Sequence, residues 1–294
     1  APRVNEVGRE PMHAAFFAFE PENKSLQKKE SSRFLNLDGK WLFHWVADAD
    51  KCLKDKFYMP GYDVSGWSEI QVPGMWELNG YGDPLYVNTG FPWKGNFENN
   101  PPQVPDSANA IGTYRRTVRI PASWKGMDVK AHFGSATSCL SLWVNGRYVG
   151  YGEDSKLEQE FDITPFVTPG KDAVIVLQLR RWCDGTYLED QDFFRFSGLA
   201  RENYLFARPK NHIADLRVIP TLTPDYRDGI LDVEFDLKGK GDVKAVLYDA
   251  QGKEVASYEK NGVRGTVKAE MRVENAAKWT AETPNLYTLT TTLT

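Results

Sequence analysis

Acidic and aromatic side chains alternate in the stretch from Asp184 to Arg201, which reads Asp-Gly-Thr-Tyr-Leu-Glu-Asp-Gln-Asp-Phe-Phe-Arg-Phe-Ser-Gly-Leu-Ala-Arg. Carboxylates accept hydrogen bonds from sugar hydroxyls, and flat rings cover the C–H face of a sugar ring. The stretch therefore indicates a carbohydrate contact. On composition alone, a solvated acidic loop pinned by its own arginines is the simpler explanation.

The composition is that of an ordinary globular chain. It has 294 residues, 41% of them hydrophobic, with 36 basic and 40 acidic side chains and a net charge of -4. That length is enough for two domains. The sequence has no basic stripe, so nucleic acid is not expected as a partner. No apolar run approaches the roughly 18 residues that span a membrane.

Metal and disulfide motifs are not visible in the sequence. The cysteines Cys52, Cys139 and Cys183 are odd in number and far apart. This pattern argues against a disulfide framework and gives no CxxC spacing, so each is expected to be a small buried apolar side chain. The four histidines are scattered as well, and none is expected to bind a metal.

Strands dominate the pattern that must position the acidic stretch. Residues 34–45 are predicted to form a hairpin that turns at Asp38-Gly39, and residues 113–120 alternate as a strand does. Residues 140–151 are predicted to form a second hairpin, because Asn145-Gly146 suits a type I′ turn. The apolar run 173–179 indicates a buried strand, and the acidic stretch follows it directly. Residues 57–112 are rich in Pro, Gly and Asn and are predicted to be long functional loops.

After residue 210, strand patterns recur at the spacing of an aligned sandwich. A face with period two is formed by Val267, Ala269, Met271 and Val273. The candidate strands cover residues 215–222, 230–237, 243–248, 254–258, 267–273 and 286–293. A sandwich with seven strands needs one more than these, so we expect the chain to stop inside a longer protein. The absence of long amphipathic helices completes an all-β prediction.

Several motifs, in order along the chain, carry a resemblance. They are Leu37-Asp-Gly-Lys-Trp, Pro84-Leu-Tyr-Val-Asn88, Trp143-Val-Asn-Gly-Arg-Tyr-Val-Gly-Tyr-Gly-Glu-Asp-Ser155, Phe161-Asp-Ile, Tyr187-Leu-Glu-Asp-Gln-Asp192 with Arg195-Phe-Ser-Gly198, and Trp279-Thr-Ala-Glu-Thr-Pro-Asn-Leu-Tyr287. From about Phe34 to its last residue, the chain resembles the large bacterial β-galactosidases of glycoside hydrolase family two. The resemblance favours the carbohydrate interpretation of the acidic stretch over the solvated loop.

The resemblance implies an order of domains. An extended amino-terminal arm (residues 1–32) would precede a jelly-roll sugar-binding domain (33–209) and an incomplete immunoglobulin-like β-sandwich (212–294). The two catalytic glutamates of such retaining enzymes lie in a later (β/α)8 barrel. No alternating βα pattern follows residue 210. We therefore assign no catalytic residue to this chain and expect it to be inactive without the barrel.

Two positions carry over as substrate contacts. Asn88 matches an asparagine that hydrogen-bonds galactose hydroxyls, and Asp192 matches an aspartate that binds galactose and a sodium ion. The alternatives are a turn-stabilising role for Asn88 and an ion pair of Asp192 with Arg195 or Arg201. The other sodium ligands of the family come from the barrel, so the site would be incomplete here. The parent enzyme is expected to use sodium and magnesium, with neither bound tightly by this fragment.

The remaining expectations follow from the same resemblance. Glu189 and Asp190 match structural positions of the family. The residues Phe193-Phe194-Arg195 stand where the best-known members often have Trp-Arg, and this difference leaves the finer substrate preference open. The partners implied are a β-galactoside, the barrel of the same protein and further copies in a homo-oligomer, to which the arm could contribute. The alternative is a free-standing carbohydrate-binding module without catalysis. A bacterial enzyme of this kind would be cytoplasmic or periplasmic, and the sequence does not decide between the two.

Overall fold

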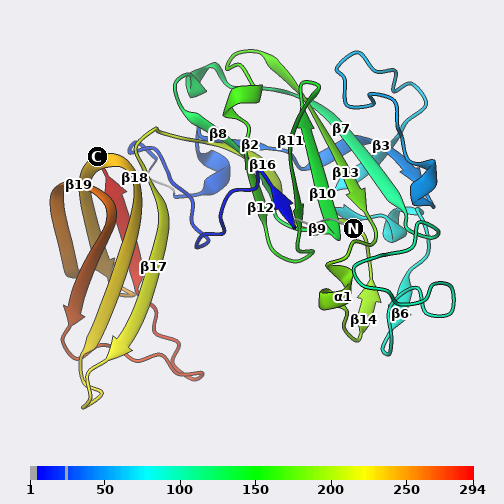
Figure 1. The fold of residues 1–294 in the computed structure, drawn as a ribbon. Helices are drawn as coiled ribbons and strands as arrows, with labels where there is room; N and C mark the ends of the chain where they lie inside the picture. Colours follow the sequence, from blue (N-terminus) through cyan, green and yellow to red (C-terminus); the bar gives the residue numbers. More distant parts are fainter. Residues whose placement is uncertain (1–4, 24–25) are drawn as a thin grey trace. The chain divides into compact units, whose positions relative to one another are not determined.

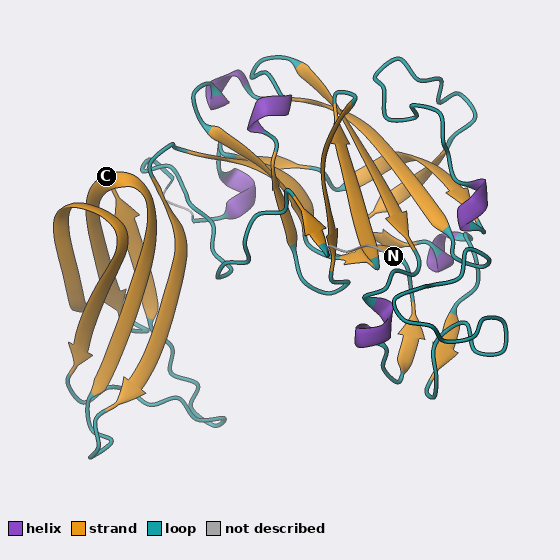
Figure 2. Ribbon diagram, viewed as in Figure 1, coloured by secondary structure: helices purple, strands orange, loops and turns teal. Residues whose placement is uncertain are grey.

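The computed structural model of the chain describes residues 5–23 and 26–294. They fall into two compact units, one from Ala1–Pro11 and Ala18–Ala207 and the other from Met12–Phe17 and Arg208–Thr294. The arm expected over residues 1–32 is thus shared between the units, and its residues 1–4 and 24–25 lie outside the described part. Strands predominate in both units (Figures 1 and 2).

The first unit consists of short strands with single-turn helices between them (Figure 1). The strands are β1 (Glu6–Val7), β2 (Phe34–Asn36), β3 (Gly39–Val46), β4 (Ser68–Val72), β5 (Gly74–Met75), β6 (Leu85–Val87), β7 (Ile111–Arg119), β8 (Asp128–Phe133), β9 (Ala136–Thr137), β10 (Cys139–Val144), β11 (Arg147–Glu153), β12 (Gln159–Asp162), β13 (Asp172–Arg180), β14 (Phe193–Arg195), β15 (Gly198–Leu199) and β16 (Asn203–Arg208). The helices are η1 (Lys28–Glu30), η2 (Ala49–Lys51), η3 (Glu77–Asn79), η4 (Ala122–Trp124), η5 (Thr164–Phe166) and α1 (Thr186–Glu189).

Two antiparallel sheets build the sandwich of the first unit. One has the order β1-β11-β10-β13-β7-β3-β4, and the other has the order β12-β8-β16-β2. Two small sheets, β14-β6 and β5-β15-β9, are formed by the segments that follow β4 and β13, together with β9 between β8 and β10. The predicted hairpin at Asn145-Gly146 joins β10 to β11, and both turn residues have positive φ, as a type I′ turn requires.

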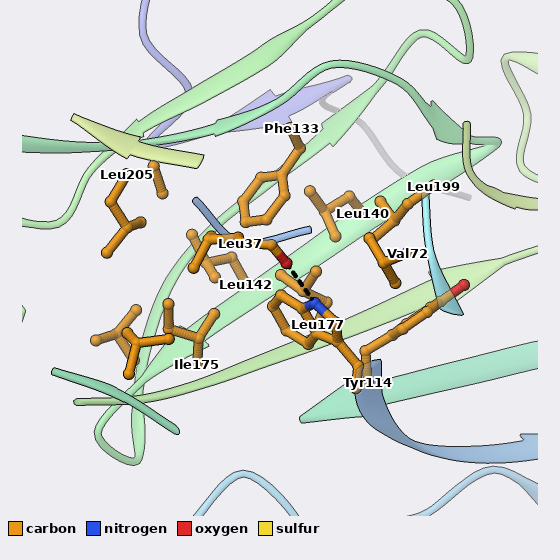
Figure 3. Close-up of a cluster of buried hydrophobic side chains, with 14 of the residues drawn as sticks. Leu37, Val72, Tyr114, Phe133, Leu140, Leu142, Ile175, Leu177, Leu199 and Leu205 are labelled. Carbon is orange, nitrogen blue, oxygen red and sulfur yellow. Dashed lines mark hydrogen bonds between the residues drawn. The ribbon is translucent and has the colours of Figure 1, made fainter. Parts of the chain in front are cut away.

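The core of this sandwich follows from the alternation of its strands (Figure 3). Leu140 and Leu142 of β10, and Ile175 and Leu177 of β13, are fully buried. Because side chains on a strand point to alternate faces, these residues share the inner face of the large sheet. Their burial fixes the register of β13, whose last residues lead into the acidic stretch.

One predicted hairpin is wrong. The pair Asp38-Gly39 does not join two neighbouring strands, since β2 pairs with β16 in the smaller sheet and β3 pairs with β4 and β7 in the larger one. The chain instead passes from one sheet to the other at this corner, where Gly39 has φ 122. The indole N–H of Trp41 donates to the carbonyl of Leu37 at 2.8 Å inside the core (Figure 3). Burying both side chains outweighs the local turn preference.

The second unit is an immunoglobulin-like sandwich of four long strands. They are β17 (His212–Leu222), β18 (Gly229–Tyr248), β19 (Glu254–Val273) and β20 (Thr288–Leu293). The predicted strands at 230–237 and 243–248 are two halves of β18, which bends with register shifts after Leu237 and Gly241. The first half pairs with β17 and the second with β20, so one strand serves both layers. The predicted face from Val267 to Val273 is buried as expected.

Within the described residues, no helix combines the length and apolar character needed to cross a bilayer. α1, with 4 residues, is the longest helix that the structure shows there.

Candidate functional site

A two-stranded ribbon brings the two predicted sugar contacts together. β6 and β14 are antiparallel, with Phe193 opposite Val87 and Phe194 opposite Tyr86. Continuing this register by one pair sets Asp192 opposite Asn88, at one end of the ribbon. Both residues are exposed. Two positions that are far apart in the sequence are therefore neighbours, with their polar groups open to a ligand.

Tyr86 is the partner of Asp192. Its hydroxyl donates a hydrogen bond to Oδ1 of Asp192 across the ribbon. This hydrogen bond to a carboxylate, together with partial desolvation, raises the pKa of Tyr86, so the phenol keeps its proton and acts as the donor. The sequence analysis quoted this tyrosine within a motif but gave it no role, because the contact depends on the pairing of two distant strands.

Arg195 and Arg201 have partners other than Asp192. Nη2 of Arg195 forms an ion pair with Asp190, and its Nη1 donates to the carbonyl of Phe193 at 2.8 Å. Arg201 donates to the carbonyl of Lys156 at 2.7 Å. Burial raises the pKa of Asp190, and the charge of Arg195 acts in the opposite direction. The alternative of an ion pair at Asp192 thus has no support in these contacts.

The acids that precede Asp192 hold the loop in place. Glu189 ends α1 and accepts hydrogen bonds from the backbone N–H of Ser155 at 2.8 Å and from its hydroxyl at 2.5 Å. Asp190 is held by Arg195, which is only 6% exposed. With both carboxylates occupied inside the loop, Asp192 is the acid of this group that remains available to a ligand, together with Asn88 on the neighbouring strand.

The long aromatic loop before β7 supports the acidic stretch. The hydroxyl of Tyr187 donates to the carbonyl of Gln103 at 2.7 Å. Its ring meets Phe91 edge to face at 4.7 Å and Trp93 at 5.0 Å between centroids. Trp93 is 4% exposed, so this packing is a small core of its own. Part of the segment 57–112, which was predicted to be functional, is therefore in direct contact with the acidic stretch.

Exposed aromatic rings lie beside the two polar residues. Tyr86 is 52% exposed and Phe194 is 55% exposed, and their ring centroids are 5.4 Å apart. Phe194 also stacks on Phe196 at 5.7 Å. Rings next to a carboxylate and an amide form the combination that sugar-binding sites use, because a sugar has both an apolar face and hydroxyls.

A second polar group lies at the start of the acidic stretch. Carboxylate oxygens of Glu153 and Asp184 and the sulfur of Cys183 lie within 4.8 Å of one another. Burial, with a further contribution from Asp184, raises the pKa of Glu153 to about 7, while a hydrogen bond from Tyr151 at 2.6 Å opposes this. Oδ1 of Asp184 is buried without a hydrogen-bond partner. A buried carboxylate beside a half-buried one with an unpaired oxygen suits a hard cation, for which oxygen ligands are preferred.

These features define a class. Two antiparallel β-sandwiches follow one another, and the first carries a ribbon with acids, an amide and exposed rings, as in the carbohydrate-recognising domains of glycoside hydrolases. The chain belongs to glycosyl hydrolase family 2. The model of that family's sugar-binding domain matches residues 34–209, and a second model of the family matches residues 211–294.

Curated relatives agree with this family. The chain is 36% identical to a β-galactosidase of Priestia megaterium over 99% of its own length and 29% of that enzyme. It is 35% identical to a β-galactosidase of Lactobacillus delbrueckii subsp. bulgaricus over 97% of its length and 28% of that enzyme. The chain therefore spans under a third of the relatives it matches.

Solved structures share the fold. β-Glucuronidase 2 of Bacteroides uniformis superposes with a TM-score of 0.69 at 20% identity, over 89% of this chain and 30% of that one. A β-glucuronidase of Ruminococcus gnavus gives 0.67 at 20% identity, over 90% of this chain and 44% of that one. At this identity, the likeness concerns the architecture of the two sandwiches.

Proposed function

We propose that this chain is the amino-terminal part of a β-galactosidase, which removes terminal non-reducing β-D-galactose by a retaining mechanism. The proposal is supported by the identity to curated β-galactosidases over nearly the whole chain. Because the chain spans under a third of those enzymes, the rest of the protein would supply the catalytic glutamates. The present chain would supply one wall of the galactose pocket.

The observation that carries this proposal is the pairing of β6 with β14. It sets Asn88 and Asp192 side by side at one end of an exposed ribbon. The Asp192 carboxylate would accept hydrogen bonds from galactose hydroxyls, and the Asn88 amide would both donate and accept. Tyr86 donates to Oδ1 of Asp192, which orients the carboxylate and leaves Oδ2 toward the ligand. Hydrogen bonds that strengthen in the transition state at such hydroxyls lower the barrier of glycoside hydrolysis.

Catalysis is assigned to other domains. A retaining glycosidase holds an acid/base and a nucleophile about 5–5.5 Å apart on either side of the bond that is cleaved. Glu189 and Asp190 are committed to Ser155 and Arg195, and the adjacent acids Glu153 and Asp184 belong to a buried group.

The cations that the family resemblance implies have candidate ligands here. Asp192 offers one carboxylate to a sodium ion, and the other ligands would come from the rest of the protein. Glu153 and Asp184 would hold magnesium, which would neutralise the two neighbouring carboxylates and give the unpaired Oδ1 of Asp184 a partner. The ion would hold the acidic loop near β11.

Two measurements test this function. The purified chain should hydrolyse no aryl β-galactoside, whereas the full-length protein should hydrolyse it with retention. Turnover by the isolated chain would contradict the placement of catalysis elsewhere. A full-length protein that prefers another glycoside would contradict the galactose assignment, while the fold and family would stand.

A free-standing carbohydrate-binding module is the second candidate, and the exposed rings of Tyr86 and Phe194 favour it. It requires the isolated chain to bind galactosides by itself. Titration of the chain with isopropyl thio-β-galactoside, followed by NMR, separates the two. Binding tighter than about millimolar by the chain alone would favour the module, and weaker or absent binding would favour a pocket completed by other domains.

A further inference from the structure

Two free cysteines from distant parts of the sequence meet under the acidic loop. Cys139 begins β10 and pairs with Arg180 at the end of β13. The chain then turns back, so that the sulfur of Cys183 approaches the carbonyl of Ser138 at 3.9 Å. Because Ser138 immediately precedes Cys139, this contact brings Cys183 next to the start of β10. Neither cysteine is in a disulfide in this structure.

The backbone holds the two cysteines in this arrangement. The N–H of Ser138 donates to the carbonyl of Arg180 at 2.9 Å, which fixes β10 against the end of β13. The N–H of Cys183 donates to the hydroxyl of Thr186 at 3.1 Å, which fixes the turn that follows. A disulfide needs two sulfurs about 2.05 Å apart on backbones that already lie close. These backbone contacts bring the start of β10 and the turn at Cys183 together, as a disulfide between the two residues needs.

We propose that Cys139 and Cys183 are a site of reversible oxidative modification, in which a small peroxide converts the thiol pair to a disulfide. One thiol gives up its proton and its sulfur attacks an oxygen of hydrogen peroxide, so the O–O bond breaks, the leaving hydroxide takes up that proton as water, and a sulfenic acid forms. The second thiol attacks that sulfur, so the S–S bond forms and a second water leaves. Two thiols and one peroxide thus give one disulfide and two waters.

A small oxidant suits the surroundings. Cys139 is 2% exposed and Cys183 is 5% exposed, which excludes bulky disulfides from direct attack. A cavity of about 270 Å³ is lined by Ser138, Trp182 and Thr186, the immediate neighbours of the pair. Hydrogen peroxide is little larger than water and fits such a space. The disulfide would fasten the start of the acidic loop, at Asp184, to β10.

The test uses the reduced chain with its three cysteines. After exposure to hydrogen peroxide and unfolding under non-reducing conditions, the number of thiols that react with Ellman's reagent should fall from three to one. The intact mass should fall by two hydrogen atoms, and peptide mapping should link Cys139 to Cys183. Dithiothreitol should restore all three thiols, and the oxidised chain should melt at a higher temperature than the reduced one.

Three variants sharpen the result. Cys52→Ser removes the half-buried third cysteine and should still form the disulfide, whereas Cys139→Ala and Cys183→Ala should not. The proposal is overturned if three thiols remain after oxidation, if the linkage involves Cys52, or if the pair gains oxygen atoms without becoming linked. Peptide mapping of the oxidised, unmutated chain tests the proposed link between Cys139 and Cys183 even if a variant does not fold. This test does not depend on the proposed galactosidase activity.

Discussion

The hydroxyl of Tyr86 donates a hydrogen bond to the carboxylate of Asp192, and this contact crosses the ribbon formed by β6 and β14. Of the two oxygens of Asp192, Oδ1 is thereby occupied. The carboxylate that the sequence predicts to be a sugar contact is thus oriented by a residue from a strand more than a hundred positions away.

Tyr86→Phe in the full-length protein should lower kcat/KM for an aryl β-galactoside about 10- to 100-fold, because one hydrogen bond to a charged group is worth roughly 1.5–3 kcal/mol. Tyr148→Phe is the matched control, because Tyr148 is 48% exposed and lies on the β10–β11 hairpin away from the ribbon. In the background of Asp192→Asn, the Tyr86 substitution should have a much smaller effect. Equal effects in both backgrounds would show that Tyr86 does not act through Asp192.

Asp192→Asn in the full-length protein should lower kcat/KM. The lost transition-state stabilisation should be about 2–4 kcal/mol, the cost of removing a charged hydrogen-bond partner that is used in the transition state. Glu189→Gln should reduce it much less, because Glu189 bonds Ser155 inside the loop. Rates should be normalised to folded protein, since Glu189→Gln weakens two loop contacts. Equal losses would mean that Asp192 is not the substrate-contacting acid.

Magnesium should raise the melting temperature of the isolated chain by a few degrees at millimolar concentration, and a chelator should reverse the change. The ion would bind only the folded state, where Glu153 and Asp184 are adjacent. Asp184→Asn should abolish the response, whereas Asp192→Asn should leave it unchanged. A melting temperature that is independent of magnesium would contradict this site.

Acid should destabilise the second sandwich through Asp228. Its buried carboxylate accepts hydrogen bonds from Arg227, Arg272 and the backbone N–H of Asn275, which hold its pKa well below the ordinary value of 3.8. A pKa depressed by folding contributes stability that is present above about pH 4 and is lost as the pH falls further. Urea unfolding between pH 6 and pH 2 should show this loss.

The control for the acid prediction lies four residues further along the chain. Asp232 is exposed on β18, so Asp232→Asn should keep the acid dependence of the unmutated chain. Asp228→Asn should be less stable near neutral pH and should flatten the dependence below about pH 4. An acid profile unchanged by Asp228→Asn would assign the effect to other carboxylates.

Gly112→Ala should destabilise the first sandwich by about 1–3 kcal/mol through overpacking. A methyl group there would meet the ring of Trp76 at 2.4 Å and that of Phe43 at 2.8 Å. Gly61→Ala is the control, since nothing lies within 4 Å of the added carbon. Denaturant midpoints of the two variants give the comparison, and equal midpoints would mean that the aromatic rings can move aside.

The sequence by itself determined the all-β class, the buried faces and the identity of the motifs. A period-two pattern such as Val267 to Val273 is local, so the buried face of a strand can be recognised from the sequence of that strand alone. The turn at Asn145-Gly146 was predictable for the same reason, because its backbone conformation is set by those two residues. The motif around Asp192 pointed to sugar without any knowledge of its neighbours.

Only the tertiary structure decided which residues meet. The corner at Asp38-Gly39 and the continuous β18 depend on which sheet buries each half of the segment, and no local pattern encodes that choice. The pairing of Tyr86 with Asp192 and the contact of Cys183 with Ser138 arise in the same way. Contacts between residues far apart in the chain are fixed by strand register, and that register is set by packing of the whole core.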